Sequence, residues 1–379
     1  MNRLQELHDQ GQSIWLDYID RTMLRNGGLE RRIRDDFLMG MTSNPTIFEK
    51  ALAEGSEYDD QIRTASGDFT ALELFELIAT TDVRTACDTF GPTYDGTKRG
   101  DGYVSIEVSP AAANDANATI SEAERLWATV NRPNAFIKVP GTDEGAVAVR
   151  RLIARGININ ITLLFSIDAH AKVIEAYMAG LEDRVAAGKT IDSIASVASF
   201  FVSRVDTEVD KRLAALKAKA PADRQAALAK LEGKLAIANA KLAYRLYQER
   251  FSSARWKALA AKGGRVQRPL WASTSTKNPA YRDVMYVENL IGPDTVNTMP
   301  PQTIEAFREH GVVARTVDKD VDVAEQTVRD LAAVGISMKD VTDKLLVDGL
   351  ASFQKSFDEL IAGLEKKTQS LGRALMAQR

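Results

Sequence analysis

A lysine lies inside an apolar run of this sequence. Lys138 is the fourth residue of AFIKVP, residues 135–140. Burial disfavours the ammonium form of a lysine, and a lysine that is partly neutral near pH 7 can attack a carbonyl carbon and form a Schiff base. An edge-strand lysine that extends its amine to water would give the same run. The run by itself leaves both interpretations open.

Two further apolar runs carry polar residues at every second position. Side chains alternate across a strand, so that residues two apart share a face. The polar positions are Asn158, Asn160 and Thr162 in ININIT and Ser105 and Glu107 in GYVSIEV. Isoleucine and valine fill the alternate positions and suit an outer layer of helices. We therefore expect the polar faces to point into a barrel, where such groups must be hydrogen-bonded or contact a ligand.

Polar residues stand near the carboxyl ends of the first five predicted strands. They are Asp17, Asn44, Glu107, Lys138, Asn160 and Thr162. Barrel enzymes carry their catalytic groups at these strand ends. Because the six polar side chains lie at about the same height along five strands, we expect them to form one shared site. Taken singly, each residue also has a structural interpretation. These are a helix cap for Asp17 or Asn44, an ion pair for Glu107 with Lys138, and a β-forming residue for Thr162.

Candidate anion-binding residues follow in the later strands. SFFVSR ends in Arg204, where a helix is expected to begin and its backbone N–H groups would add to the positive charge. Ser199 and Ser203 lie in the same run, and ASTSTKN contributes Ser275 and Lys277. Phosphate often binds after the late strands of a barrel, so these residues predict a phosphate site. Alternatively, Arg204 and Lys277 lie on the surface and bind no ligand.

Composition narrows the classes of function. The chain has 379 residues and a net charge of -3, which gives no reason to expect nucleic acid or an anionic membrane as a partner. No uninterrupted apolar stretch approaches the roughly 20 residues of a membrane span. The single cysteine, Cys87, cannot form an intrachain disulfide. A reducing, cytoplasmic location is the simplest interpretation.

The sequence shows no pattern for a metal or nucleotide site. His8, His170 and His310 are far apart in the sequence, and neither CxxC nor HxxxH occurs. A metal site built from nitrogen and sulfur ligands is therefore not expected, although a magnesium site made of carboxylates alone stays open. Neither GxGxxG nor GxxxxGK[ST] is present. We predict no metal and no cofactor.

Short apolar runs alternate with longer amphipathic stretches along most of the chain. The predicted strands cover residues 13–17, 37–45, 102–110, 135–140, 157–165, 194–204, 268–276 and 294–300. Eight strand–helix units within about 310 residues predict an α/β fold, a (β/α)8 TIM barrel. An open doubly wound sheet is the alternative, but no glycine-rich first turn supports it.

Two regions exceed a minimal barrel. Residues 205–263, between the sixth and seventh strands, are rich in alanine, lysine and arginine and predict helices with a solvated face or a hairpin. Residues 318–371 predict C-terminal helices that pack on the barrel wall. No long linker separates either region, so we expect one barrel domain over residues 1–379.

Five segments occur in the order MTSNP, VSIEV, FIKVPGTDEG, NITLLFS and SFFVSR. Together they resemble the transaldolase family, in particular its longer bacterial form, from about residue 10 to 310. The resemblance implies a Schiff-base barrel enzyme without metal that transfers a dihydroxyacetone unit from sedoheptulose 7-phosphate to glyceraldehyde 3-phosphate. The products would be erythrose 4-phosphate and fructose 6-phosphate, in the non-oxidative pentose phosphate pathway.

The resemblance also implies a role for each site residue. Lys138 would form the Schiff base, and Glu107 and Thr162 would hold the water that carries protons during its formation. Asp17 would take the hydroxyl proton as the carbon–carbon bond breaks. The implied substrate-binding residues are Thr42, Ser43, Asn44 and Asn160 for the dihydroxyacetone unit, Ser199 and Arg204 for the phosphate, and Phe201 at the entrance.

Two segments depart from the better-known members. SFF stands where those members tend to have a proline, and STSTKN lacks their arginine, so Ser275 or Lys277 would replace it at the phosphate.

Two other functions stay open: a related fructose 6-phosphate aldolase and a non-catalytic barrel that binds sugar phosphates. The chain length and Glu107 favour transfer over simple cleavage, and Asp17 and Lys138 argue against a non-catalytic barrel. We expect sugar phosphates as ligands and a monomer or homodimer.

Overall fold

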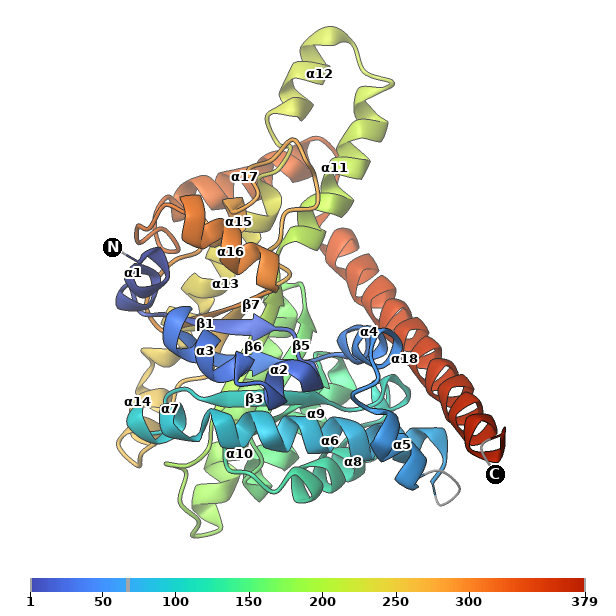
Figure 1. The fold of residues 1–379 in the computed structure, drawn as a ribbon. Helices are drawn as coiled ribbons and strands as arrows, with labels where there is room; N and C mark the ends of the chain where they lie inside the picture. Colours follow the sequence, from blue (N-terminus) through green and yellow to red (C-terminus); the bar gives the residue numbers. More distant parts are fainter. Residues whose placement is uncertain (1, 66–68, 378–379) are drawn as a thin grey trace.

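Eight parallel strands close into a barrel in the computed structural model, which describes residues 2–65 and 69–377 (Figure 1). The strands are β1 (Gln12–Asp17), β2 (Leu38–Thr42), β3 (Tyr103–Glu107), β4 (Ala135–Pro140), β5 (Ile159–Leu164), β6 (Ser196–Phe201), β7 (Arg268–Ala272) and β8 (Thr295–Met299). The predicted (β/α)8 barrel is confirmed. The doubly wound alternative is wrong, because β8 pairs with β1 and leaves no free sheet edge. Met1, residues 66–68 and residues 378–379 of the predicted domain lie outside the described residues.

Several predicted strands run past the observed strand into the following loop. The prediction for residues 37–45 contained β2 but also the start of the next helix, α4 (Pro45–Glu54). Pro45 is the first residue of α4, and the Asn44 side chain accepts a hydrogen bond from the Ile47 N–H at 3.0 Å. Proline suits this position because it has no N–H to satisfy. Pro45 therefore marks a helix start rather than a strand end.

The interior of the barrel has an aromatic layer below its polar layer. Trp15, Tyr103 and Phe136 pack together inside the barrel, and the Tyr103 and Phe136 rings stack at 4.4 Å between centroids. Gly40 leaves room for Trp15, since a Cβ there would lie 2.5 Å from the indole. The isoleucines of β5 belong instead to the core between strands and helices. The alternation in ININIT thus has the predicted orientation.

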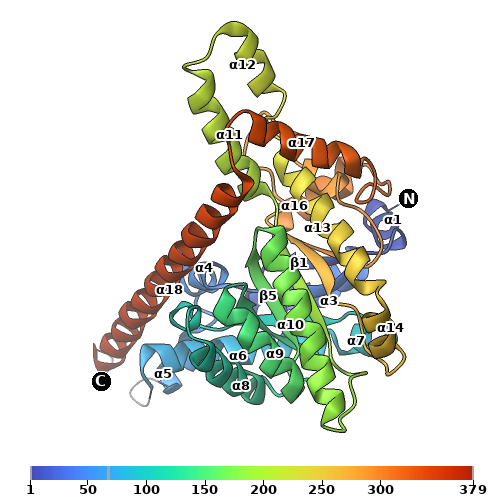
Figure 2. The same cartoon turned by 180° about the vertical axis from the view of Figure 1, so that it is seen from behind.

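The helices surround the barrel on all sides (Figures 1 and 2). Besides α4 they are α1 (Arg3–Asp9), α2 (Arg21–Arg25), α3 (Gly28–Asp35), α5 (Asp59–Ala65), α6 (Ala71–Thr89), α7 (Gly91–Gly96), η1 (Pro110–Ala112), α8 (Ala116–Val130), α9 (Asp143–Arg155), α10 (Ile167–Ala186), α11 (Ser203–Lys217), α12 (Ala222–Ala229), α13 (Leu235–Phe251), α14 (Ala254–Ala260), α15 (Met285–Glu288), α16 (Pro301–His310), α17 (Val321–Ala333) and α18 (Met338–Ala377). No helix among the described residues is long and apolar enough to cross a membrane.

The two additional helical regions divide into exposed and packed parts. In both views α11 and α12 project from the body, and α12 is exposed apart from Leu228 (Figure 2). By contrast, α13 buries Tyr244 and Tyr247 and packs against α10, α17 and β7. Residues 205–263 therefore combine two helices with one buried and one solvated face, α11 and α13, and the exposed helix α12.

The predicted C-terminal helices pack on other helices around the barrel, α17 against α13, and α18 against α4, α6 and α11. The strand arrows of Figure 1 point towards α18, which also contacts α5, η1 and the end of β5. Of these neighbours, α4, η1 and the end of β5 lie at the carboxyl ends of strands, so α18 also reaches the mouth of the barrel. Gly349 allows α18 to approach the end of β5 closely there.

Candidate active site

The strand register brings the central polar residues to one level. Glu107 of β3 lies opposite Lys138 of β4, and Lys138 lies opposite Asn160 of β5. The Lys138 Nζ donates a hydrogen bond to Glu107 Oε2 at 3.0 Å and to the Ser43 carbonyl oxygen at 3.3 Å. Both side chains are over 90% buried. Glu107 and Lys138 thus form a buried ion pair at the carboxyl end of the barrel.

Glu107 is a carboxyl group that can hold a proton more readily than an exposed one. Burial raises the pKa of Glu107, and the nearby Asp17 carboxylate adds to this effect. The positive charge of Lys138 and its hydrogen bond oppose the shift. An acid–base group next to an amine is the arrangement that imine formation requires.

Asp17 ends β1 and faces the same space. The Thr42 hydroxyl donates to Asp17 Oδ1 at 2.8 Å and in turn lies 2.7 Å from the Thr298 hydroxyl of β8. Burial raises the pKa of Asp17, whereas the charges of Lys138, Lys277 and Arg204 and the Thr42 hydrogen bond lower it. Asp17 is not a helix cap, since the cap of α2 is Asp20. The interpretation as a helix cap is therefore wrong for Asp17, but it is correct for Asn44, which caps α4.

Two predicted substrate-binding residues lie below the cavity rather than on its wall. The Asn160 amide donates to Ser105 Oγ at 3.0 Å and accepts from Ser199 Oγ at 2.6 Å, and its side chain is fully buried. The Ser43 hydroxyl donates to the Ser105 carbonyl oxygen at 2.7 Å. Asn160 and Ser43 thus support the residues above them.

A cavity of about 550 Å³ lies over this layer and collects the other predicted site residues. They are Asp17, Thr42, Asn44, Glu107, Lys138, Thr162, Ser199, Phe201, Arg204, Ser275 and Lys277. Seven strands, β1 to β7, and the segments after them position these side chains around one opening. A sugar phosphate is of a size that such a cavity accommodates.

The cationic side of the cavity lies after β6 and β7. The Arg204 guanidinium, in the first turn of α11, lies 5.1 Å from the centre of the Phe201 ring. Burial lowers the pKa of Arg204, and the Asp17 carboxylate opposes this. The Lys277 Nζ donates to Ser275 Oγ at 2.8 Å. Two cations near a helix start are suited to a phosphate group.

Comparison with known proteins agrees with this geometry. A family model described as Transaldolase/Fructose-6-phosphate aldolase matches residues 14–364. The chain belongs to this family. The match includes every strand from β2 to β8 and reaches into α18, so the family's sequence pattern extends beyond the barrel.

Individual members of the family match over almost their whole length. The transaldolase of Trichodesmium erythraeum (strain IMS101) is 47% identical over 374 residues, which cover 98% of each chain. The transaldolase of Thermobifida fusca (strain YX) is 48% identical over 360 residues, 94% of this chain and 96% of the relative. Transaldolase 2 of Nostoc sp. (strain PCC 7120 / SAG 25.82 / UTEX 2576) is 46% identical over 376 residues, 98% of this chain and 99% of the relative.

The cavity of this family member has wall residues that sequence reasoning missed. Thr298 supports Thr42, and Lys50 of α4 lines the rim. The missed residues of α18 are Gly349, Ser352, Phe353 and Ser356. The position of Thr298 at a strand end was a usable signal, because Asp17 and Glu107 occupy such positions too. The sequence around residues 349–356 carries no comparable signal.

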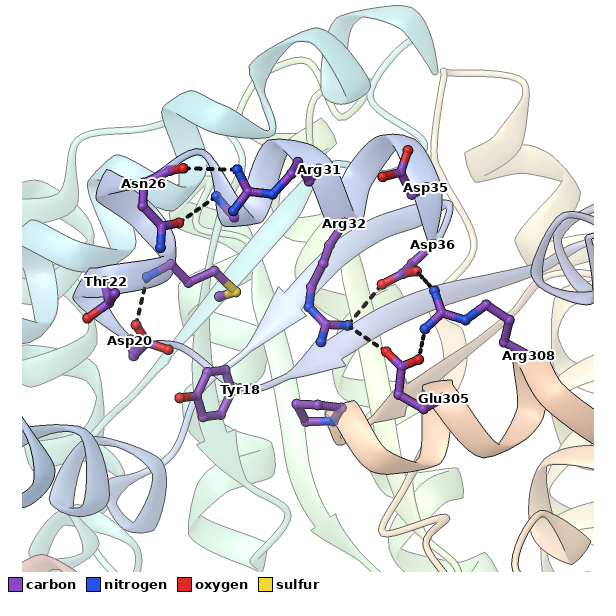
Figure 3. Close-up of a pocket in the computed structure, with 13 residues that line it drawn as sticks. Tyr18, Asp20, Thr22, Asn26, Arg31, Arg32, Asp35, Asp36, Glu305 and Arg308 are labelled. Atoms are coloured by element: carbon purple, nitrogen blue, oxygen red, sulfur yellow. Dashed lines mark hydrogen bonds and ion pairs between the residues drawn. The ribbon is translucent and has the colours of Figure 1, made fainter.

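A second, more open pocket of about 480 Å³ lies between α2, α3 and α16 (Figure 3). Four of its charged side chains pair with one another: Asp36 accepts from Arg32 at 2.9 Å and from Arg308 at 2.8 Å, and Glu305 contacts both arginines. No predicted site residue lines it. The paired charges explain this pocket as a surface ion network.

Proposed function

We propose that this chain is a transaldolase that transfers a dihydroxyacetone unit from sedoheptulose 7-phosphate to glyceraldehyde 3-phosphate through a Schiff base. The products would be erythrose 4-phosphate and fructose 6-phosphate. The buried Lys138, hydrogen-bonded to Glu107 in the barrel cavity, carries the proposal. The names of the relatives, which match over nearly their whole length, support transfer rather than simple cleavage.

The first part of the reaction is imine formation. The Lys138 amine, after giving a proton to the Glu107 carboxylate, would attack the keto carbon of the donor. Glu107 would then return protons, through a water held with Thr162, so that the carbinolamine loses water. The 3.0 Å hydrogen bond between Lys138 and Glu107 supports this exchange.

The second part is cleavage and transfer. Asp17 would take the proton of the C4 hydroxyl while the bond between C3 and C4 breaks. The protonated imine accepts the electron pair and leaves a three-carbon carbanion on Lys138. The aldehyde of glyceraldehyde 3-phosphate then accepts that carbanion, and hydrolysis of the new imine releases fructose 6-phosphate.

The remaining residues would hold the substrate along the cavity. Asn44 and Thr42 would bind hydroxyls of the dihydroxyacetone unit near Lys138. Arg204, Lys277 and Ser275 would bind the phosphate at the other side, with Ser199 and Phe201 between. Asn160 and Ser43 would act from below, by fixing Ser199 and the backbone beside Lys138.

The test is reductive trapping. The protein is incubated with fructose 6-phosphate and borohydride, and the adduct is located by intact-mass and peptide mass spectrometry. We expect a reduced three-carbon adduct on Lys138, and Lys138→Ala should give no adduct and no turnover while keeping the circular dichroism spectrum of the fold. Absence of an adduct on any lysine of the folded protein would contradict the Schiff-base mechanism and favour a sugar-phosphate-binding barrel.

The cellular setting follows from less direct observations. We infer a cytoplasmic location, because the only cysteine, Cys87, is buried and unpaired and the net charge gives no membrane affinity. A monomer or homodimer remains our prediction, which light scattering would decide.

A further inference from the structure

One face of α18 forms part of the wall of the cavity that contains Lys138. The residues of this face, called here the α18 face, are Gly349, Ser352, Phe353 and Ser356. Their spacing of three, four and seven residues places them on one side of the helix. The cavity is therefore bounded by a helix more than 200 residues away from Lys138 in the sequence.

The α18 face is held against the barrel at two points. The Thr46 hydroxyl of α4 donates to Ser356 Oγ at 2.8 Å. At Gly349 a Cβ would lie 3.1 Å from Leu163 Cδ2, so the glycine allows α18 to approach the end of β5 closely. Leu163 follows Thr162 and has a left-handed backbone with φ of 59°. The position of α18 is thus linked to the strand end that carries Thr162.

The two phenylalanines of this part of α18 have different surroundings. Phe357 is partly buried against the apolar core, and its ring meets Phe75 edge-on at 5.8 Å between centroids. Phe353, one turn earlier, is partly buried and lines the cavity instead. Core packing accounts for Phe357, whereas Phe353 presents an apolar surface to the cavity that also contains Lys138.

The helix contacts elements on both sides of the strand that carries Lys138. Its neighbours α4 and η1 follow β2 and β3, and α18 also contacts the end of β5. Lys138 is on β4, between these strands. The phosphate-binding candidates Arg204 and Lys277 line the same cavity and lie after β6 and β7.

Coverage matters because the three-carbon unit has two possible fates. Protonation of the carbanion gives an iminium ion, and addition of one water then yields free dihydroxyacetone and the Lys138 ammonium group. Attack of the carbanion on an acceptor aldehyde gives transfer. Limiting the access of water and the escape of the ketone favours transfer.

We propose that the α18 face, with Phe353 as its apolar centre, covers the Lys138-bound three-carbon unit and thereby sets the ratio of transfer to release of dihydroxyacetone. The proposal rests on the transaldolase function proposed above. Phe353 acts by contact with the bound unit and by exclusion of water, and Ser356 and Gly349 hold the helix in place.

The test compares two rates for the full-length protein and for Phe353→Ala. One is the release of dihydroxyacetone from fructose 6-phosphate without acceptor, and the other is transfer to erythrose 4-phosphate. We expect the ratio of release to transfer to rise about tenfold, which corresponds to roughly 1.4 kcal/mol between the two barriers. Borohydride should still trap the adduct on Lys138. The matched control is Val347→Ala, because Val347 is 66% exposed on the same helix, and its ratio should not change.

A second variant separates coverage from folding. Ser356→Ala removes the hydrogen bond to Thr46 and keeps the side-chain volume small, and it should raise the same ratio with an unchanged helical circular dichroism signal. A ratio in both variants equal to that of Val347→Ala would overturn the proposal, even if overall activity falls. Wild-type protein that neither transfers nor forms an adduct would instead overturn the transaldolase function itself.

Discussion

At the scale of single residues, two carboxyl groups with different partners divide the proposed chemistry. Glu107 is hydrogen-bonded to Lys138, whereas Asp17 is hydrogen-bonded to the Thr42 hydroxyl. Burial raises the pKa of both groups. The different partners allow Glu107 to serve imine formation and Asp17 to serve carbon–carbon cleavage.

Asp17→Asn should separate these two steps. Imine formation should survive because Lys138 and Glu107 keep their hydrogen bond, while cleavage should slow by about 10²- to 10⁴-fold, the usual contribution of a general base. After borohydride trapping with fructose 6-phosphate, the variant should carry a six-carbon adduct and the wild type a three-carbon adduct. Equal loss of both adducts would contradict the role given to Asp17.

Thr42→Val should change the pH dependence of cleavage. The Thr42 hydrogen bond lowers the pKa of Asp17, so its removal should raise that pKa further. Asp17 must be ionised to accept a proton, and its rate contribution is lost as pH falls through the pKa. The acid limb of the single-turnover cleavage rate should therefore move to higher pH in Thr42→Val. Thr42→Ser keeps the hydroxyl and should leave the acid limb of the pH–rate profile unchanged. Equal pH–rate profiles for Thr42→Val and Thr42→Ser would show that the Thr42 hydroxyl does not control the pKa of Asp17.

At the scale of elements, α10 carries a histidine that the site does not use. His170 is fully buried, and its ring lies 5.8 Å from Phe200 of β6 between centroids. Neither ring nitrogen has a hydrogen-bond partner among the described residues. Burial lowers the pKa of His170 from 6.5 to about 4. The packing of α10 on β6 thus depends on a neutral imidazole.

This histidine should make the protein sensitive to acid. Below pH 6.5 the His170 imidazole of the unfolded chain binds a proton, whereas in the folded chain it binds one only near pH 4. The free energy of unfolding therefore falls as the pH decreases from 6.5 to about 4. The loss at the lower end is about 3 kcal/mol. His170→Leu should flatten the decrease in urea-unfolding free energy between pH 7 and pH 4.5. His310→Gln, which alters an exposed histidine, is the control and should retain the decrease.

At the scale of the whole molecule, one end of the barrel carries a stabilising polar cluster and the other end carries the candidate active site. At the amino-terminal end, Asp101 accepts hydrogen bonds from Ser13 and Trp15 of β1 and pairs with Arg268 of β7 at 3.0 Å. The aromatic layer lies between this cluster and Lys138. Asp101 therefore joins the strands on both sides of β8, remote from the catalytic cavity.

Asp101→Ala should destabilise the protein without changing its chemistry. Loss of the carboxylate leaves the largely buried Arg268 without its ion partner, at a cost of about 3 kcal/mol. The kcat for transfer at 25 °C should stay within twofold or so of the wild-type value, since only stability depends on this cluster. Asp183→Ala, which breaks an exposed pair with Arg150, should cost less than about 1 kcal/mol. A large fall in kcat for Asp101→Ala would contradict the assignment of stability to the amino-terminal end of the barrel and of catalysis to the carboxyl end.

Much of the fold and of the candidate site follows from local sequence patterns. Alternation in ININIT separates the faces of β5 because side-chain direction on a strand depends only on position along the chain. For the same reason, the places of Glu107 and Lys138 at neighbouring strand ends could be predicted before their hydrogen bond was known. Pro45 and Asn44 likewise specify the start of α4 through backbone geometry and capping.

The tertiary structure decided the features that depend on contacts between distant segments. Thr42 meets Thr298 across 256 residues, and Thr46 meets Ser356 across 310 residues. A helix such as α18 has the same local pattern whether it packs on the barrel wall or crosses the mouth of the barrel. Its position depends on the close approach of Gly349 to Leu163, which no local pattern encodes. The sequence by itself thus determined the strands and their catalytic ends, and only the closed fold decided what covers them.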